Sequence, residues 1–122
     1  TIYEERDIVG HVRRVAPAFL AGMKRFEDHP LIGEARGVGL VGALEFVRDK
    51  TTKENFAPSA GVAAHAGRMA TKHGVITRGL GDIISLCPAM IITEEQVEEM
   101  LSAIGRALDD TLVWARAEGL VA

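Results

Sequence analysis

The chain has 122 residues, of which 48% are hydrophobic and 25% are charged, and its net charge is -3. These values are typical of one globular domain, and the acidic balance argues against a nucleic-acid partner. No apolar run reaches the roughly 18 residues of a membrane span, while a single cysteine, Cys87, excludes an intrachain disulfide and favours a reducing, cytoplasmic compartment.

Residues 3–27 are predicted to form a helix with one apolar stripe. The stripe recurs at spacings of three and four: Ile8, Val12, Val15, Phe19, Met23 and Phe26. Pro17 lies inside this pattern, and the continuity of the stripe past it favours a kinked helix over two separate ones. The chain starts at Thr1 without a methionine, so we expect a piece of a longer protein.

Residues 34–47 are typical of β-structure, because apolar residues alternate between two faces. Gly37 and Gly39 are expected to divide this stretch into two short pieces or to form a bulge. Residues 37–42 also match the pattern G-x-G-x-x-G. A dinucleotide site would need a helix to open at its end, whereas a strand follows here, so we favour a bulged strand.

Residues 59–73 are predicted to form a helix of small residues that approaches a sheet closely, with Ser59 as its N-cap. Lys72, His73 and Gly74 are typical of its C-terminus. A hairpin follows, in which strands 75–78 and 82–87 flank the turn Gly79-Leu80-Gly81.

The last helix is predicted to begin at a capping box formed by Thr93 and Gln96. Its buried stripe comprises Val97, Met100, Leu101, Ile104, Leu108 and Leu112, while Val113 and Trp114 fall outside it. The whole order is helix, strand, helix, strand, strand, helix. It predicts an α+β fold, with helices packed on a small, mostly antiparallel sheet of three or four strands.

Most residues that could carry chemistry have a simpler interpretation. The four histidines, His11, His29, His65 and His73, show no metal-ligand spacing. Cys87 lies in an apolar strand and is expected to be buried as a small hydrophobe. The glutamates at 94, 95, 98 and 99 occupy the first turns of the last helix, where negative charge is favourable at a solvated face.

Arg78 is the one candidate binding residue. A guanidinium at a rigid strand end suits bidentate binding of a carboxylate or phosphate, and the adjacent glycines allow a ligand to approach. The alternative is a surface arginine that pairs with Asp82 across the turn. No residue of this chain is assigned a catalytic or metal-binding role.

Two stretches, HPLIGEARGVGLVGALEFVRDKTTKENFAP and GVITRGLGDIISLCPAMIITEEQVEEM, resemble the C-terminal region of class III pyridoxal phosphate-dependent aminotransferases, the omega-transaminases. The likeness runs from Tyr3 to about Trp114, although the family has two prolines where this chain has Pro88-Ala89. It implies that residues 1–122 are the small C-terminal domain of a homodimeric or larger enzyme. A missing large domain would hold pyridoxal phosphate and the Schiff-base lysine, and Arg78 would bind the substrate carboxylate.

The lysines of this chain agree with that division, since Lys24, Lys50, Lys53 and Lys72 occupy polar contexts that would not lower the pKa of an amine. We therefore expect the chain alone to be inactive and the parent to move an amino group from an amine or omega-amino acid to a keto acid such as pyruvate. The alternative is a free-standing α+β module for anion binding or oligomerisation.

Overall fold

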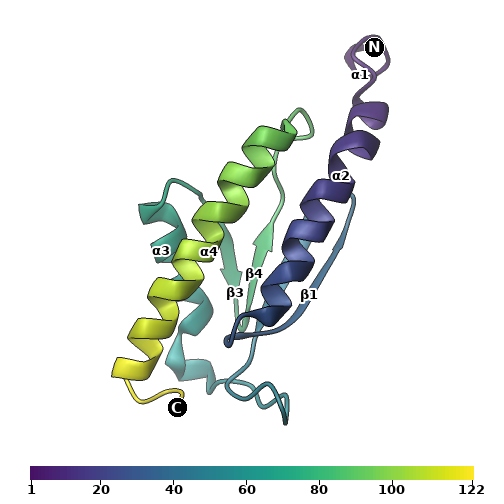
Figure 1. Ribbon diagram of the computed structural model, residues 1–122. Coiled ribbons are helices and arrows are strands. Elements are labelled where there is room, and N and C mark those ends of the chain that lie inside the picture. Colours follow the sequence, from purple (N-terminus) through teal and green to yellow (C-terminus); the bar gives the residue numbers. More distant parts are fainter.

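The computed structural model describes residues 1–122 as helices packed on one face of a four-stranded sheet (Figure 1). The elements are α1 (Ile2–Glu5), α2 (Ile8–Arg25), η1 (Phe26–Asp28), β1 (Ile32–Val38), β2 (Val41–Phe46), η2 (Pro58–Ala60), α3 (Val62–Lys72), β3 (Arg78–Leu80), β4 (Ile83–Leu86) and α4 (Glu94–Ala117). The strand order is β1-β2-β4-β3, and every neighbouring pair is antiparallel. The predicted α+β fold is confirmed.

The first predicted helix is interrupted near its start. Asp7 adopts a left-handed backbone conformation, with φ 47°, and separates α1 from α2. Beyond that point α2 runs unbroken through Pro17, as the continuous apolar stripe indicated. Its inward face buries Val15, Phe19 and Met23 against the sheet.

The glycine-rich stretch forms a hairpin and no bulged strand. Gly39, with φ +59°, allows the tight turn between β1 and β2. The preference for a bulge here was therefore wrong, and the alternative of two short pieces is correct. The only irregularity in this pairing lies earlier, between Ile32 and Glu34. No helix opens after Gly42, so the dinucleotide pattern has no structural counterpart.

The small-residue helix α3 begins later than predicted, because Pro58–Ala60 form a 3-10 turn and Gly61, with φ +66°, precedes α3. Ser59 is therefore not its N-cap. The predicted C-terminus is confirmed, since His73 caps α3 and Gly74 has a φ of +94°.

The turn of the second hairpin starts two residues later than expected, and residues 75–77, which were predicted as strand, lie outside β3. Arg78, Gly79 and Leu80 belong to β3, and the turn consists of Gly81 and Asp82. Gly79 is not part of the turn. Its lack of a side chain allows β3 to approach α3 closely, because a β-carbon at this position would lie 3.3 Å from the carbonyl oxygen of Ala63. Gly81, with φ +60°, supplies the conformation that the turn requires.

The last helix begins where predicted, but its buried face is wider than the predicted stripe and also includes Ala103, Ala107, Thr111 and Ala115. Thr93 and Gln96 form the predicted capping box. Val113 is exposed as expected, but Trp114 packs on the core and its ring stacks on that of His65 at 4.0 Å. Trp114 therefore belongs to a part of α4 that contacts α3 and that the predicted stripe did not include.

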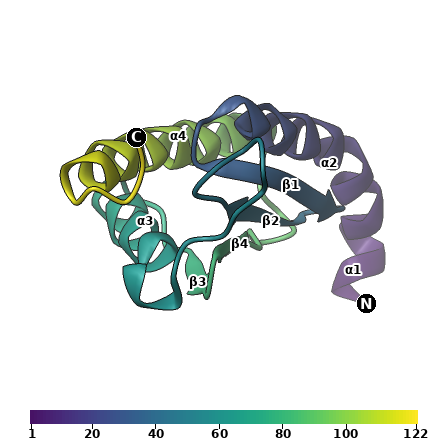
Figure 2. The same cartoon turned by 90° about the horizontal axis from the view of Figure 1, so that it is seen from below.

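The molecule therefore has two layers, with α2, α3 and α4 all on one side of the sheet (Figure 2). Strand residues that face these helices, such as Leu44, Ile84 and Leu86, are at most 2% exposed. We call the other side the open face, because no residue on it is buried. Its strand residues are Glu34, Arg36, Val38, Val41, Ala43, Glu45, Arg78, Leu80, Ile83 and Ser85.

Candidate functional site

Arg78 is the first residue of β3, an edge strand, and its side chain is exposed. It makes no ion pair within 4.0 Å, so the pairing with Asp82 does not form. The backbone carbonyl of Asp82 instead accepts a hydrogen bond from the Phe46 N–H at 2.7 Å, which ties the turn to β2. The guanidinium therefore stands at an anchored strand end without a carboxylate of its own.

The position of β3 is set from two sides. On one side it pairs with β4, where Arg78 lies opposite Ser85. On the other, Gly79 approaches the backbone of Ala63 in α3. Any side chain at position 79 would push β3 away from α3, so this glycine holds Arg78 close to the helix.

A second arginine lies in register with Arg78 across the open face. The strand pairings align Arg36, Ala43, Ser85 and Arg78 in one row, so three strand spacings of about 4.8 Å separate the two arginine backbones. Sequence reasoning missed this row, because Arg36 and Arg78 are joined only through β2 and β4. The alternation of residues along each strand indicates which side chains share a face, but it does not give the register between neighbouring strands.

Arg36 differs from Arg78 in its surroundings. Its guanidinium donates to Glu45 at 2.8 Å and to Glu34 at 3.1 Å. The hydrogen bond to Glu45 is the main cause that raises the pKa of Arg36 above its ordinary value. Arg36 is thus already paired with two carboxylates, whereas Arg78 is available to an anion from outside this chain.

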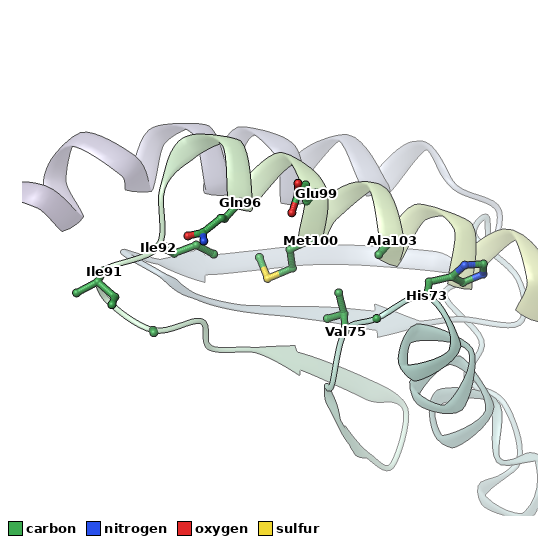
Figure 3. A pocket seen from close by; sticks show the side chains of 10 residues that line it. His73, Val75, Ile91, Ile92, Gln96, Glu99, Met100 and Ala103 are labelled. Atoms are coloured by element: carbon green, nitrogen blue, oxygen red, sulfur yellow. The ribbon is translucent and has the colours of Figure 1, made fainter.

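The hollow in Figure 3 does not contain Arg78. It has a volume of about 460 Å³ and lies between α4, the β4–α4 loop and the segment that joins α3 to β3. Val75, Ile92 and Met100 make it largely apolar, and it has no lysine or arginine in its lining. His73, the one basic side chain in its lining, is already paired with Asp110 at 2.7 Å, so this hollow offers no free cation for a carboxylate or phosphate.

The four lysines do not form a site for an aldehyde cofactor. Lys24 pairs with Glu27 at 3.0 Å, and Lys53 donates to the Gly33 carbonyl at 2.8 Å. Lys50 donates to the carbonyls of Glu27 and His29, and Lys72 is exposed at the end of α3. None lies in an apolar pocket, where a Schiff-base lysine would have a lowered pKa, so these residues do not fit pyridoxal phosphate.

The remaining candidate residues are dispersed over the surface. No three of the His, Cys, Asp and Glu side chains gather where they could hold a metal ion. The four glutamates of α4 are exposed, in agreement with the sequence interpretation. Cys87 is also exposed, which contradicts the predicted burial, because it follows Leu86, the last helix-facing residue of β4.

His29 and Asp109 join the end of η1 to α4. The His29 Nδ1 accepts the Leu31 N–H at 3.2 Å, and its Nε2 lies 3.1 Å from Asp109 Oδ1. Since Nδ1 accepts, the neutral ring carries its proton on Nε2 and donates it to Asp109. Burial is the main cause that lowers the pKa of His29, and it outweighs the opposing effect of Asp109.

We expect acid to destabilise this chain as the pH falls from above 6.5 toward the lowered pKa of His29. A lowered folded-state pKa means that the unfolded chain binds the proton first, so the contribution of His29 is present above the ordinary value of 6.5 and is lost as pH falls through the folded pKa. Urea unfolding of the wild type and of His29→Asn measures the free energy of unfolding, which should depend less steeply on pH in the variant.

His65 contributes with the same sign, because its pKa is also lowered mainly by burial. An additional His65→Asn change should therefore reduce the pH dependence of the free energy of unfolding further. An unchanged slope in both variants would contradict this prediction.

The comparisons with known proteins agree with one another. The sequence profile of the class III aminotransferases matches residues 1–108. The mitochondrial gamma-aminobutyrate transaminase 1 of Solanum lycopersicum is 41% identical over 110 residues, which are 90% of this chain and 21% of that protein. The relatives' names include both mitochondrial and chloroplastic proteins. Within this chain, no helix has the length and hydropathy needed to cross a bilayer.

Solved structures give the same result. A thermostable omega-transaminase mutant from Pseudomonas jessenii matches with a TM-score of 0.87 and 38% identity, over 93% of this chain and 25% of that one. A PMP-bound aminotransferase from Vibrio fluvialis matches with a TM-score of 0.85 and 38% identity, over 88% of this chain and 24% of that one. The chain therefore spans about a fifth to a quarter of the length of these relatives.

Proposed function

Because this chain is a member of the class III aminotransferase family, we propose that residues 1–122 form the small C-terminal domain of a longer pyridoxal phosphate-dependent transaminase. One observation carries this proposal. The aligned segment makes up 90% of this chain but only 21% of gamma-aminobutyrate transaminase 1 from Solanum lycopersicum. The parent moves an amino group from an amine or omega-amino acid to a keto acid such as pyruvate.

In this proposal the work is divided between two parts of one polypeptide. The large domain binds the cofactor, which acts as an electron sink during amino transfer. The small domain, residues 1–122, supplies Arg78, which binds the substrate carboxylate through charge-assisted hydrogen bonds. The absence of an acidic partner for Arg78 and the anchored position of β3 support that role.

The parent is further proposed to be a homodimer or larger homo-oligomer. A cytoplasmic location remains a prediction from composition, since curated relatives bear mitochondrial and chloroplastic names.

The full-length gene product tests the proposal. It should show a pyridoxal absorbance band and transfer the amino group of an omega-amino acid to pyruvate. A gene that encodes only residues 1–122, or a full-length protein without cofactor and without transfer, would contradict it.

The isolated chain should neither bind the cofactor at one specific lysine nor transaminate. Its lysines are exposed or bonded to carbonyl and carboxylate oxygens, so no amine is favoured in its neutral, reactive form. Incubation with pyridoxal phosphate, borohydride reduction and peptide mapping should give only sparse, distributed labelling. Stoichiometric labelling of a single lysine would overturn this prediction.

A further inference from the structure

We infer that the groove between α2 and α4 is the surface on which a second copy of this chain docks about a twofold axis. This inference goes beyond the proposed function, because it needs neither the cofactor nor the large domain. The groove has a volume of about 540 Å³ and belongs to the helical layer, on the side of the sheet opposite the open face (Figure 2).

The two helices that form the groove run in the same direction (Figure 1). Gly22 of α2 lies beside Leu101 of α4, whose side chain occupies the space that a β-carbon at position 22 would need. One turn further on, a β-carbon at Gly105 would lie 3.6 Å from the ring of Phe26. Positions on the two helices therefore keep the same order along the groove.

Short side chains line the middle of the groove. Ala21 of α2 and Ser102 of α4 are exposed on its two walls, with Gly22 between them and the core. Helices pack at interaxial distances of about 8–10 Å, and small residues at the contact allow the shorter of these distances. Another pair of helices can therefore approach this part of the molecule closely.

The two ends of the groove carry opposite charges. Arg25 lines one end from α2, and Glu98 lines the other end from α4. Both residues are exposed, and neither takes part in an ion pair of this chain. Each charge is therefore available to a partner.

The spacing of these charges follows from the helix register. Glu98 precedes Leu101 by three residues, and Arg25 follows Gly22 by three residues. Because Gly22 and Leu101 lie side by side, the two charges are six helical positions apart, about 9 Å along the groove. The level of Gly22 and Leu101 is the midpoint between them.

A twofold axis that crosses the groove at this midpoint exchanges its two ends. It brings Arg25 of the second copy to the level of Glu98 of the first, and it makes the reverse contact at the other end. Both side chains line the groove, so the oppositely charged groups lie within reach of each other, and each contact is made twice, as in any isologous interface. A partner of uniform charge would meet repulsion at one end, so the charge pattern favours a second copy.

Charge reversal in residues 1–122 tests this inference without any measurement of activity. Sedimentation equilibrium should show a monomer–dimer equilibrium for the wild type. Arg25→Glu alone and Glu98→Arg alone place like charges opposite each other at both ends, so each should raise the dissociation constant at least about tenfold. The double variant Arg25→Glu/Glu98→Arg restores opposite charges and should regain the wild-type value. Glu118→Arg, at the exposed C-cap of α4 beyond the groove, controls for the change in net charge and should leave the dissociation constant unchanged.

A cysteine near the proposed axis gives a second test, which also applies to the full-length protein. In a Cys87→Ser background, Ala21→Cys places the thiols of two copies next to each other, because position 21 lies beside the midpoint of the groove. Val113→Cys is the matched control, since Val113 is 69% exposed on α4 but lies far from the midpoint. Mild oxidation should link Ala21→Cys chains into dimers on a non-reducing gel and leave Val113→Cys chains unlinked.

The contrary results are equally distinct. A wild-type chain that stays monomeric at every concentration overturns the inference, as does a dimer that both single reversals leave intact or a double variant as weak as the single ones. Equal cross-linking at positions 21 and 113, or no cross-link at position 21 in the full-length protein, overturns it as well. A cross-linked full-length protein without cofactor and without amino transfer would refute the transaminase proposal alone, whereas an active protein without the cross-link would refute the docking alone.

Discussion

Replacement of Arg78 by alanine in the full-length enzyme should weaken turnover of carboxylate substrates about ten- to a hundredfold. A charge-assisted hydrogen bond is worth about 1.5–3 kcal/mol, and each 1.4 kcal/mol corresponds to about a tenfold change in kcat/KM. Simple amines that carry no carboxylate should change little in their half-reaction, because they offer no anion to the guanidinium. The measurement is kcat/KM for an omega-amino acid, for pyruvate and for an amine.

Arg36→Ala provides the matched control for this experiment. Arg36 lies on the same face and in the same row, but it is bonded to Glu45 and Glu34. Arg36→Ala should not change the ratio of kcat/KM for carboxylate substrates to kcat/KM for simple amines. If Arg78→Ala slows acids and amines to the same extent, Arg78 is an ordinary surface residue and the carboxylate role is wrong.

Phe19→Ala should lower the free energy of unfolding of this chain by about 3–5 kcal/mol. Phe19 is fully buried in α2, and its ring lies against β2 at Gly42, where an added β-carbon would be 3.1 Å from the ring. Gly42 gives the ring its space, and alanine would leave a cavity beside it. The loss is a large fraction of the roughly 5–15 kcal/mol that stabilises a typical domain.

Val9→Ala tests whether the effect of Phe19→Ala comes from burial. Val9 lies on the same helix but is 61% exposed, so its truncation should change stability by less than about 0.5 kcal/mol. Urea unfolding followed by circular dichroism measures both variants. Equal losses at the two positions would mean that helix α2 does not pack on the sheet as described.

The predictions from local sequence succeeded where one pattern determines one element. The three- and four-residue spacing and the Thr93–Gln96 capping box predicted helices α2 and α4 correctly, although half of the buried residues of α4 lie outside the predicted stripe: Ala103, Ala107, Thr111 and Ala115. The absence of a helix between β3 and β4 was enough to make that pair antiparallel. The resemblance on the residues around Arg78 gave the family, which the profile match confirms.

Errors arose where a glycine or a small residue had more than one possible use. Gly39 allows a turn by its positive φ, whereas Gly79 has no positive φ and instead allows a close contact with Ala63. Both are glycines in the sequence, and only the neighbouring element distinguishes the two uses. Trp114 was misplaced for a related reason, since its partner His65 belongs to a helix 49 positions earlier in the chain.

The sequence by itself determined the three long helices, the fold class and the family, because short-range periodicity and capping depend on residues close together in the chain. Tertiary structure alone decided which side of the sheet remains open and which residues share a row on it. Register depends on long-range hydrogen bonds between β1, β2, β4 and β3, and a shift of one residue would move Arg78 to the opposite face. The tertiary structure also shows that Arg78 and Asp82 form no ion pair.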